Sequence, residues 1–105
     1  MALFDIHANP DTRTKAAIPY VIEVQANLLS DLGTRVVAPL VPARIFRGAV
    51  PRLNPTIPVG GEPHVLLIQQ LAAVPKLALN ARPLENAEDK RYEIIAAVDF
   101  LVTGI

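Results

Sequence analysis

The stretch TRVVAPLVPARIF, residues 34–46, decides the fold class. It is rich in β-branched and apolar residues, a composition that indicates a strand rather than a helix. Pro39 and Pro42 interrupt it, and proline donates no backbone hydrogen bond. We therefore expect an edge strand, or a strand broken by a bulge, rather than a regular central strand.

Similar short segments lie on both sides of this stretch. Residues 2–8 read as a first strand, and YVIEVQ, residues 20–25, alternates apolar and polar positions as a half-buried strand does. Residues 55–71 predict a hairpin around Gly60–Gly61, because glycine tolerates the positive φ of a tight turn. Residues 72–84 predict one more broken strand. Five to seven short strands without crossover helices favour a mainly β fold (α+β), a small antiparallel β-barrel.

A single long helix is expected last. Asn86 is its candidate N-cap, and Glu88 and Asp89 place negative charge in its first turn, where the helix dipole favours it. Between residues 94 and 102 only Asp99 is polar. A helix that lies on a barrel needs one apolar stripe. We therefore expect its last two turns to be covered from a second side as well.

The residues after this helix, Gly104 and Ile105, allow two interpretations. A glycine in the left-handed conformation ends many helices, and the next apolar residue then often folds back onto the helix. Alternatively, the glycine allows close approach and the isoleucine is displayed as an apolar tip for the pocket of a partner. The sequence leaves both open.

Length and composition exclude several classes of protein. The chain has 105 residues, 51% hydrophobic and 19% charged, which predicts one folded domain over residues 1–105. Ten basic and ten acidic residues give no net charge, which disfavours direct binding of nucleic acid by this chain. Cysteine is absent, and we find neither a signal peptide nor an apolar run of roughly 20 residues that could span a membrane. We expect a cytoplasmic protein.

Catalytic motifs are not apparent. The sequence has no nucleophile elbow, P-loop, dinucleotide-binding turn or cluster with metal-ligand spacing. His7 and His64 are interpreted as ordinary strand or surface residues. The arginines of the central segment are either a small basic patch or, in the simpler interpretation, solvated loop charges: Arg44, Arg47 and Arg52. We predict no catalytic residue, no metal and no cofactor.

Several segments in this order and spacing nevertheless resemble one family: YVIEVQANLL, RVVAPL, VPARI, PTIPVGGE, AAVP and the closing TGI. Together they make the chain similar over its whole length to the CcdB family, toxins of type II toxin–antitoxin modules. The resemblance implies an SH3-like barrel with a C-terminal helix that forms a symmetric homodimer. It also implies a toxin that is not an enzyme.

The resemblance further implies partners. CcdB toxins insert the paired C-termini of the dimer between the A subunits of DNA gyrase and trap the enzyme with cleaved DNA. A CcdA-like antitoxin neutralises them through an acidic disordered tail, and only the toxin–antitoxin complex binds operator DNA and represses the operon.

Matching positions carry these roles. The expected gyrase-binding residues are Asp99, Val102, Thr103, Gly104 and Ile105. Thr103 stands where the best-known branch has a tryptophan that stacks between the gyrase subunits. Leu28, Leu29 and Glu23 match family positions that lie toward the gyrase and antitoxin surfaces. Arg13 and Arg35 are not matched positions; they are expected to bind the antitoxin because arginines near these leucines could meet its acidic residues.

Two alternatives remain. MazF-type endoribonucleases share this fold, and RNA cleavage without a metal would require an acid–base pair and a cation. Here only His64 with Arg44 or Arg47 could supply them. The other alternative, suggested by Thr103, is a non-toxic interaction module derived from CcdB.

Overall fold

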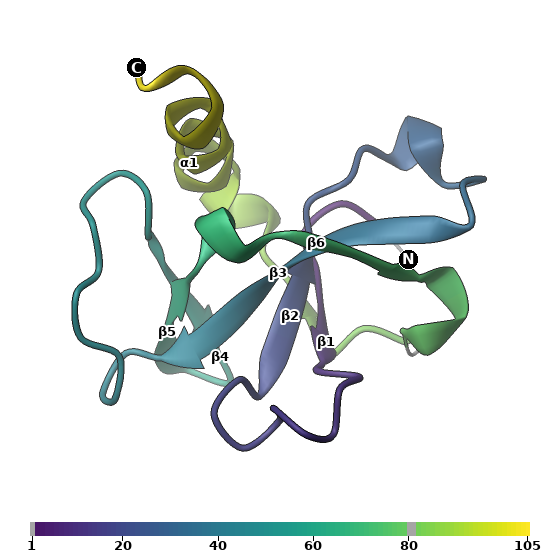
Figure 1. Ribbon diagram of the computed structural model, residues 1–105, viewed down its shortest axis with the longest axis horizontal. Helices are drawn as coiled ribbons and strands as arrows, with labels where there is room; N and C mark the ends of the chain where they lie inside the picture. Colours follow the sequence, from purple (N-terminus) through teal and green to yellow (C-terminus); the bar gives the residue numbers. More distant parts are fainter. Residues whose placement is uncertain (1, 80–81) are drawn as a thin grey trace.

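Strand β3 (Thr34–Pro42) is the centre of the sheet in the computed structural model, which describes residues 2–79 and 82–105. One edge of β3 pairs with β2 (Tyr20–Glu23). Its other edge pairs first with β6 (Ala72–Pro75) and then with β5 (Glu62–Leu66), as Figure 1 shows. The expectation of an edge strand for this segment was therefore wrong.

The position of Pro39 explains how a proline fits there. The N–H and C=O of one strand residue point to the same side, and the Pro39 carbonyl accepts a hydrogen bond from the Leu67 backbone N–H at 3.0 Å. The missing N–H of Pro39 therefore faces the edge of β3 that pairs with β6 before this residue and with β5 after it. No ladder hydrogen bond is lost, because the β6 pairing ends at Val37 and the β5 pairing begins at Leu40.

The remaining strands complete an almost closed antiparallel barrel. Their order is β4-β5-β3-β2-β1-β7, with β6 joined to β3, and every strand pair within the described residues is antiparallel. The other strands are β1 (Asp5–Ala8), β4 (Thr56–Val59) and β7 (Glu85–Asn86), and short 3-10 turns are η1 (Asn27–Leu29), η2 (Ile68–Gln70), η3 (Lys76–Ala78) and η4 (Glu88–Lys90). The mainly β barrel with a C-terminal helix is thus confirmed.

The predicted hairpin is also present. Strands β4 and β5 pair from Thr56–Val65 to Val59–Glu62 around the turn. Gly60 and Gly61 both have positive φ, 59° and 80°. Consecutive positive φ values are those of the type I′ turn, whose twist matches the flanking strands.

Helix α1 (Arg91–Thr103) begins later than expected. Asn86 lies in β7, and its side-chain oxygen accepts a hydrogen bond from the Glu88 N–H at 2.9 Å. Glu88 and Asp89 consequently belong to the 3-10 turn that leads into the helix. The acidic residue in the first turn of α1 itself is Glu93.

The helix rests on the barrel through a narrow stripe. Only Ile94 and Ala97 of α1 are fully buried, and they join the main core cluster on the inner face of the strands. The strand residues of that cluster include Ile6, Ile22 and Leu40. Beyond this contact α1 projects from the barrel (Figure 1). No helix among the described residues is long and apolar enough to cross a membrane.

Candidate functional site

The C-terminal end of α1 is a turn capped by Gly104 and by hydrogen bonds of Thr103. Gly104 adopts the left-handed conformation, with φ 75°, and its N–H donates to the Phe100 carbonyl at 2.9 Å. The Thr103 hydroxyl donates to the Asp99 carbonyl at 2.7 Å and accepts from the Ile105 N–H at 3.2 Å. The Thr103 side chain therefore shapes the backbone of this tip.

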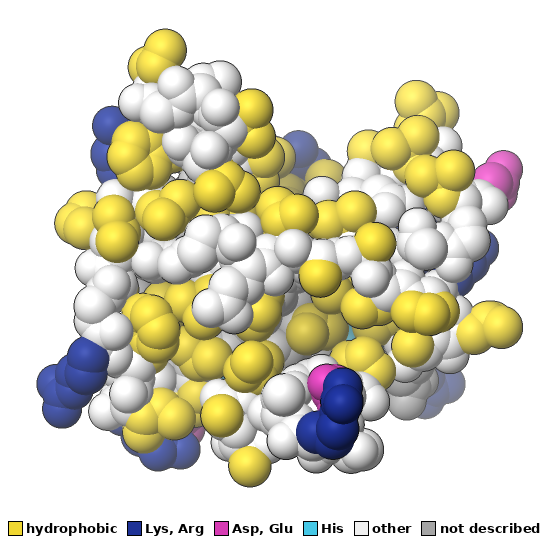
Figure 2. Space-filling model, in the orientation of Figure 1, with side chains coloured by type: hydrophobic (Ala, Val, Ile, Leu, Met, Phe, Trp, Pro, Cys, Tyr) yellow, Lys and Arg dark blue, Asp and Glu magenta, His cyan; other side chains and the backbone are white. Residues whose placement is uncertain are grey.

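The side chains of the tip point outward. Val102 is 75% exposed and Ile105 is 83% exposed, so Ile105 does not fold back onto its own helix. Of the two interpretations left open by the sequence, the folded-back isoleucine is wrong, and the fit of the exposed Ile105 to the pocket of a partner stays a prediction. Figure 2 shows a hydrophobic side chain at the far end of this projection and others around its sides.

The apolar surface continues down α1. Tyr92, Ile95 and Leu101 are exposed although the helix buries Ile94 and Ala97. The expected second cover of the last two turns is thus not supplied by the described part of the barrel. Tyr92, Ile95 and Val102 share one helix face, whereas Leu101 follows Ala97 by four residues and lies on the side of the buried stripe. An exposed apolar helix face is typical of a protein–protein contact.

The residues predicted to contact the antitoxin divide into two groups. Leu28 is 93% exposed and Leu29 47% exposed, both in the η1 turn, which forms a second projection on the same side of the view as the tip (Figures 1 and 2). Arg13 is exposed in the 9–19 loop and donates to the Asp11 carboxylate at 3.2 Å. These hydrogen bonds from Arg13 hold the pKa of Asp11 below its ordinary value and raise the pKa of Arg13.

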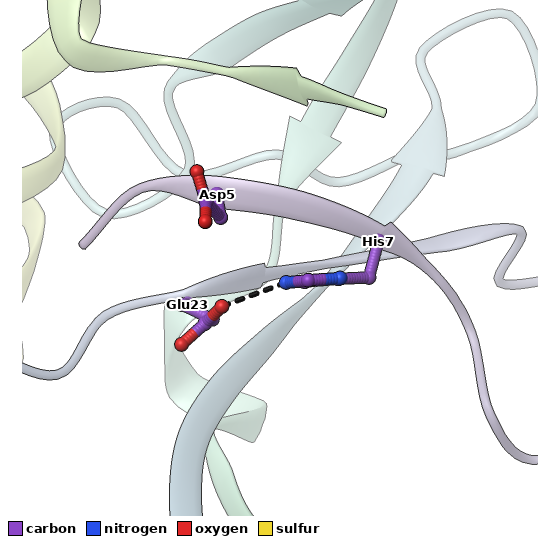
Figure 3. A group of neighbouring side chains, drawn as sticks. All are labelled: Asp5, His7 and Glu23. Atoms are coloured by element: carbon purple, nitrogen blue, oxygen red, sulfur yellow. Dashed lines mark hydrogen bonds and ion pairs between the residues drawn. The ribbon is translucent and has the colours of Figure 1, made fainter. Parts of the chain in front are cut away.

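Glu23 and Arg35 form the other group, because both side chains are buried. The Glu23 carboxylate lies 3.1 Å from Arg35 Nε and 2.7 Å from His7 Nε2, the latter contact drawn in Figure 3. The outer face of β2 is therefore covered, and the expectation of a half-buried strand at residues 20–25 was wrong. In this conformation neither charge reaches the surface, and their role toward an antitoxin stays a prediction.

Asp5 adjoins this network on the same strand as His7 (Figure 3). The ligand atoms of Asp5, His7 and Glu23 lie within 4.8 Å of one another, a grouping that sequence spacing did not reveal. Their oxygens are already engaged, however: Asp5 accepts from Ala2 N at 2.7 Å and Asn86 Nδ2 at 2.9 Å. The guanidinium of Arg35 also opposes a cation, so the arrangement is that of a buried charge network.

A separate cavity of about 380 Å³ brings together residues of the endoribonuclease alternative. His64 and Arg44 both line it with Tyr20, whose ring meets His64 edge-on at 5.2 Å. His64 Nδ1 lies 2.8 Å from the Glu62 carbonyl, and Arg44 Nε lies 3.4 Å from the Glu62 carboxylate. Glu62 thus holds both groups at the rim of the β4–β5 hairpin.

Sequence reasoning missed two associations. Asp5 and His7, two residues apart on a strand, share one face, but their meeting with Glu23 depends on strand register, which the sequence does not display. Arg52 was interpreted as a patch or loop charge, whereas its side chain contacts Phe100 and Ile105 of the tip. An arginine in a loop gives no local signal of such a distant contact.

The fold and this site define the class: a small antiparallel β-barrel protein with one C-terminal helix that displays an apolar end. The family model described as CcdB protein matches residues 3–104. The chain belongs to the CcdB family, as the sequence predicted, and is a toxin of the toxin–antitoxin type. The comparison with curated proteins found no match.

Proposed function

We propose that this chain poisons DNA gyrase by binding the A subunits of that enzyme through the tip of α1 and trapping it with cleaved DNA. The observation that carries the proposal is the exposure of Val102 and Ile105 on a capped helix end. Asp99 lies on the same helix face as Val102, about one turn away, and is exposed. A few apolar side chains held in a fixed backbone are suited to fill pockets of a partner protein.

The active form that we propose is a symmetric homodimer. The exposed face of α1 that carries Tyr92 and Ile95, three residues apart, supports this, because a two-fold axis would bury the same patch of both subunits. The two tips would then lie next to each other and could enter a gyrase dimer together. This toxin would act in the cytoplasm, where gyrase acts.

We further propose that a CcdA-like antitoxin covers the exposed leucines of η1. Leu28 and Leu29 offer apolar contacts, and Arg13 offers a cation to an acidic disordered tail. Glu23 and Arg35 would act indirectly, by holding β2 and β3 in place. The toxin–antitoxin complex, rather than this chain alone, would bind operator DNA and repress the operon, consistent with the zero net charge of the toxin.

The experiment that tests the gyrase proposal is a supercoiling and DNA-cleavage assay with purified gyrase. Deletion of Gly104 and Ile105 removes the C-cap hydrogen bond and an exposed side chain but no residue of the core, so this variant should stay folded, with a melting temperature close to that of the wild type and the same oligomeric state. It should lose the accumulation of cleaved DNA. A wild-type protein that leaves gyrase cleavage unchanged, or a deletion variant with full potency, would exclude the proposal.

The specific observation that favours RNA cleavage is the cavity shared by His64 and Arg44. We propose that this cavity is not catalytic, because His64 is buried and its Nδ1 is taken by the Glu62 carbonyl. His64→Ala should therefore retain full toxicity and full gyrase poisoning. Cleavage of RNA by the wild type that disappears in His64→Ala would instead establish the endoribonuclease.

A further inference from the structure

Arg52 connects the barrel to the tip of α1. It lies in the segment of residues 43–55 between β3 and β4, which rises beside α1 in Figure 1. Its Nη2 donates a hydrogen bond to the main-chain oxygen of Ile105. Its guanidinium carbon lies 4.5 Å from the centre of the Phe100 ring, the position of a cation–π contact. One side chain thus contacts both the last turn of the helix and the second residue beyond it.

The backbone conformation of Arg52 is one that arginine seldom adopts, and the surrounding structure holds it. Its φ of 72° lies in the left-handed region, which long L side chains seldom occupy. Asn54, which is buried, fixes the neighbouring turn: it accepts from Val50 N at 2.9 Å and donates to the Leu66 carbonyl at 2.9 Å. Such a conformation persists only where the surrounding structure determines it.

This arrangement suits the electrostatics of the helix end. The C-terminus of a helix carries partial negative charge on its last carbonyls, and a cation beside it is stabilising. Arg52 supplies that cation while the Ile105 side chain remains 83% exposed. The contact therefore restrains the backbone of the tip and leaves its apolar side chain available to a partner.

We propose that Arg52 is a positioning residue, which fixes Val102–Ile105 in the orientation presented to gyrase; this inference rests on the function proposed above. A segment that is ordered before it binds loses less conformational entropy on binding. Without Arg52 the tip would fray from Thr103 onward. The tip would then lose more conformational entropy on binding to gyrase, so its affinity for gyrase would be lower and the toxin less potent.

The test uses Arg52→Gly in the full-length chain. Glycine accepts a positive φ without strain, so the substitution removes the side chain while the turn keeps its conformation. Arg52→Lys keeps the charge and loses the planar guanidinium, and should retain part of the effect. Lys15→Gly is the matched control, because it also removes one positive charge from an exposed loop position.

Two measurements are made on each variant. Heteronuclear ¹⁵N NOE values of residues 103–105 report the order of the tip, and titration in the gyrase cleavage assay reports potency. In Arg52→Gly we expect the tip amides to lose order and potency to fall about tenfold, with a melting temperature close to that of the wild type. Lys15→Gly should match the wild type in both measurements.

An Arg52→Gly protein whose tip stays as ordered as in the wild type would overturn the inference. So would a potency loss no larger than that of Lys15→Gly. If the wild type itself has no effect on gyrase, the proposed function fails, and the order of the tip in Arg52→Gly alone then decides whether Arg52 positions it.

Discussion

Removal of one partner from the buried charge network is expected to destabilise the barrel severely. Glu23 and Arg35 face each other across β2 and β3, 3.1 Å apart, with side chains that are 0% and 1% exposed. Arg35→Met leaves Glu23 with the His7 hydrogen bond but without its cationic partner. Glu23→Gln leaves the guanidinium buried without its carboxylate.

The magnitude follows from burial. Breaking a buried ion pair by removing one partner costs about 3–5 kcal/mol, because the remaining charge keeps its desolvation penalty. A domain of this size has a total stability of about 5–15 kcal/mol, so either single variant loses a large part of it. The corresponding fall in melting temperature is on the order of 15 °C. The double variant Glu23→Leu/Arg35→Met leaves no buried charge of this pair and should lose much less than the sum of the two single losses.

Urea unfolding followed by circular dichroism measures these free energies, and a double-substitution cycle gives the coupling. We expect a coupling energy of about 2 kcal/mol or more. Single losses below about 1 kcal/mol with unchanged denaturant dependence would refute the argument, since a solvated surface pair has that magnitude. Antitoxin affinity measured on the folded fraction then separates a direct contact of Glu23 from an indirect one: an indirect role leaves that affinity unchanged.

Three further outcomes are expected. Gly104→Ala places a Cβ in open space but forces it into the left-handed region, at a cost of about 1 kcal/mol, so gyrase potency should fall about fivefold and hydrogen exchange at residue 104 should accelerate. In Arg13→Gln the pKa of Asp11, lowered in the folded chain by the hydrogen bonds from Arg13, should rise toward its ordinary value in an NMR titration. Any stability from that contact is present above the unfolded-state pKa and is lost as the pH falls through the folded-state pKa. Leu28→Ser should leave the melting temperature unchanged and weaken antitoxin binding in calorimetry, because this side chain is 93% exposed.

Local patterns predicted what depends on local physics. The Gly60–Gly61 hairpin and a single C-terminal helix both follow from residues that are neighbours in the chain. Helix α1 nevertheless begins at Arg91, because residues 88–90 form a 3-10 turn after β7. The exposure of Ile105 could not be predicted from the sequence, because a left-handed Gly104 is compatible with an Ile105 that folds back onto the helix and with one that is exposed.

Non-local pairing accounts for the errors. A proline prevents regular strand pairing only on the side where its missing N–H would face a partner strand. The sequence does not show that β3 changes its partner from β6 to β5 near Pro39. Glu23 was expected to face solvent because the sequence does not show which distant segments pack on the outer face of β2. The outer face of β2 is covered in part by a residue from beyond β6, because Leu79 packs there with Val21 and Val37. The Glu23 carboxylate on this face contacts His7 and Arg35.

The buried charge network stabilises the fold, whereas the Arg52 contact positions the tip. Variants of the two should therefore differ in whether stability or gyrase potency falls. Loss of Arg35 removes stability from the centre of the sheet but touches none of the tip residues, so the molecules that remain folded should poison gyrase with normal potency. Loss of Arg52 changes the order of the tip while the core cluster and the hairpin stay intact, so potency should fall at constant stability. If both variants instead lost potency in proportion to their loss of folded protein, the tip would be an ordinary part of the fold. Arg52 would then have no role in presenting it.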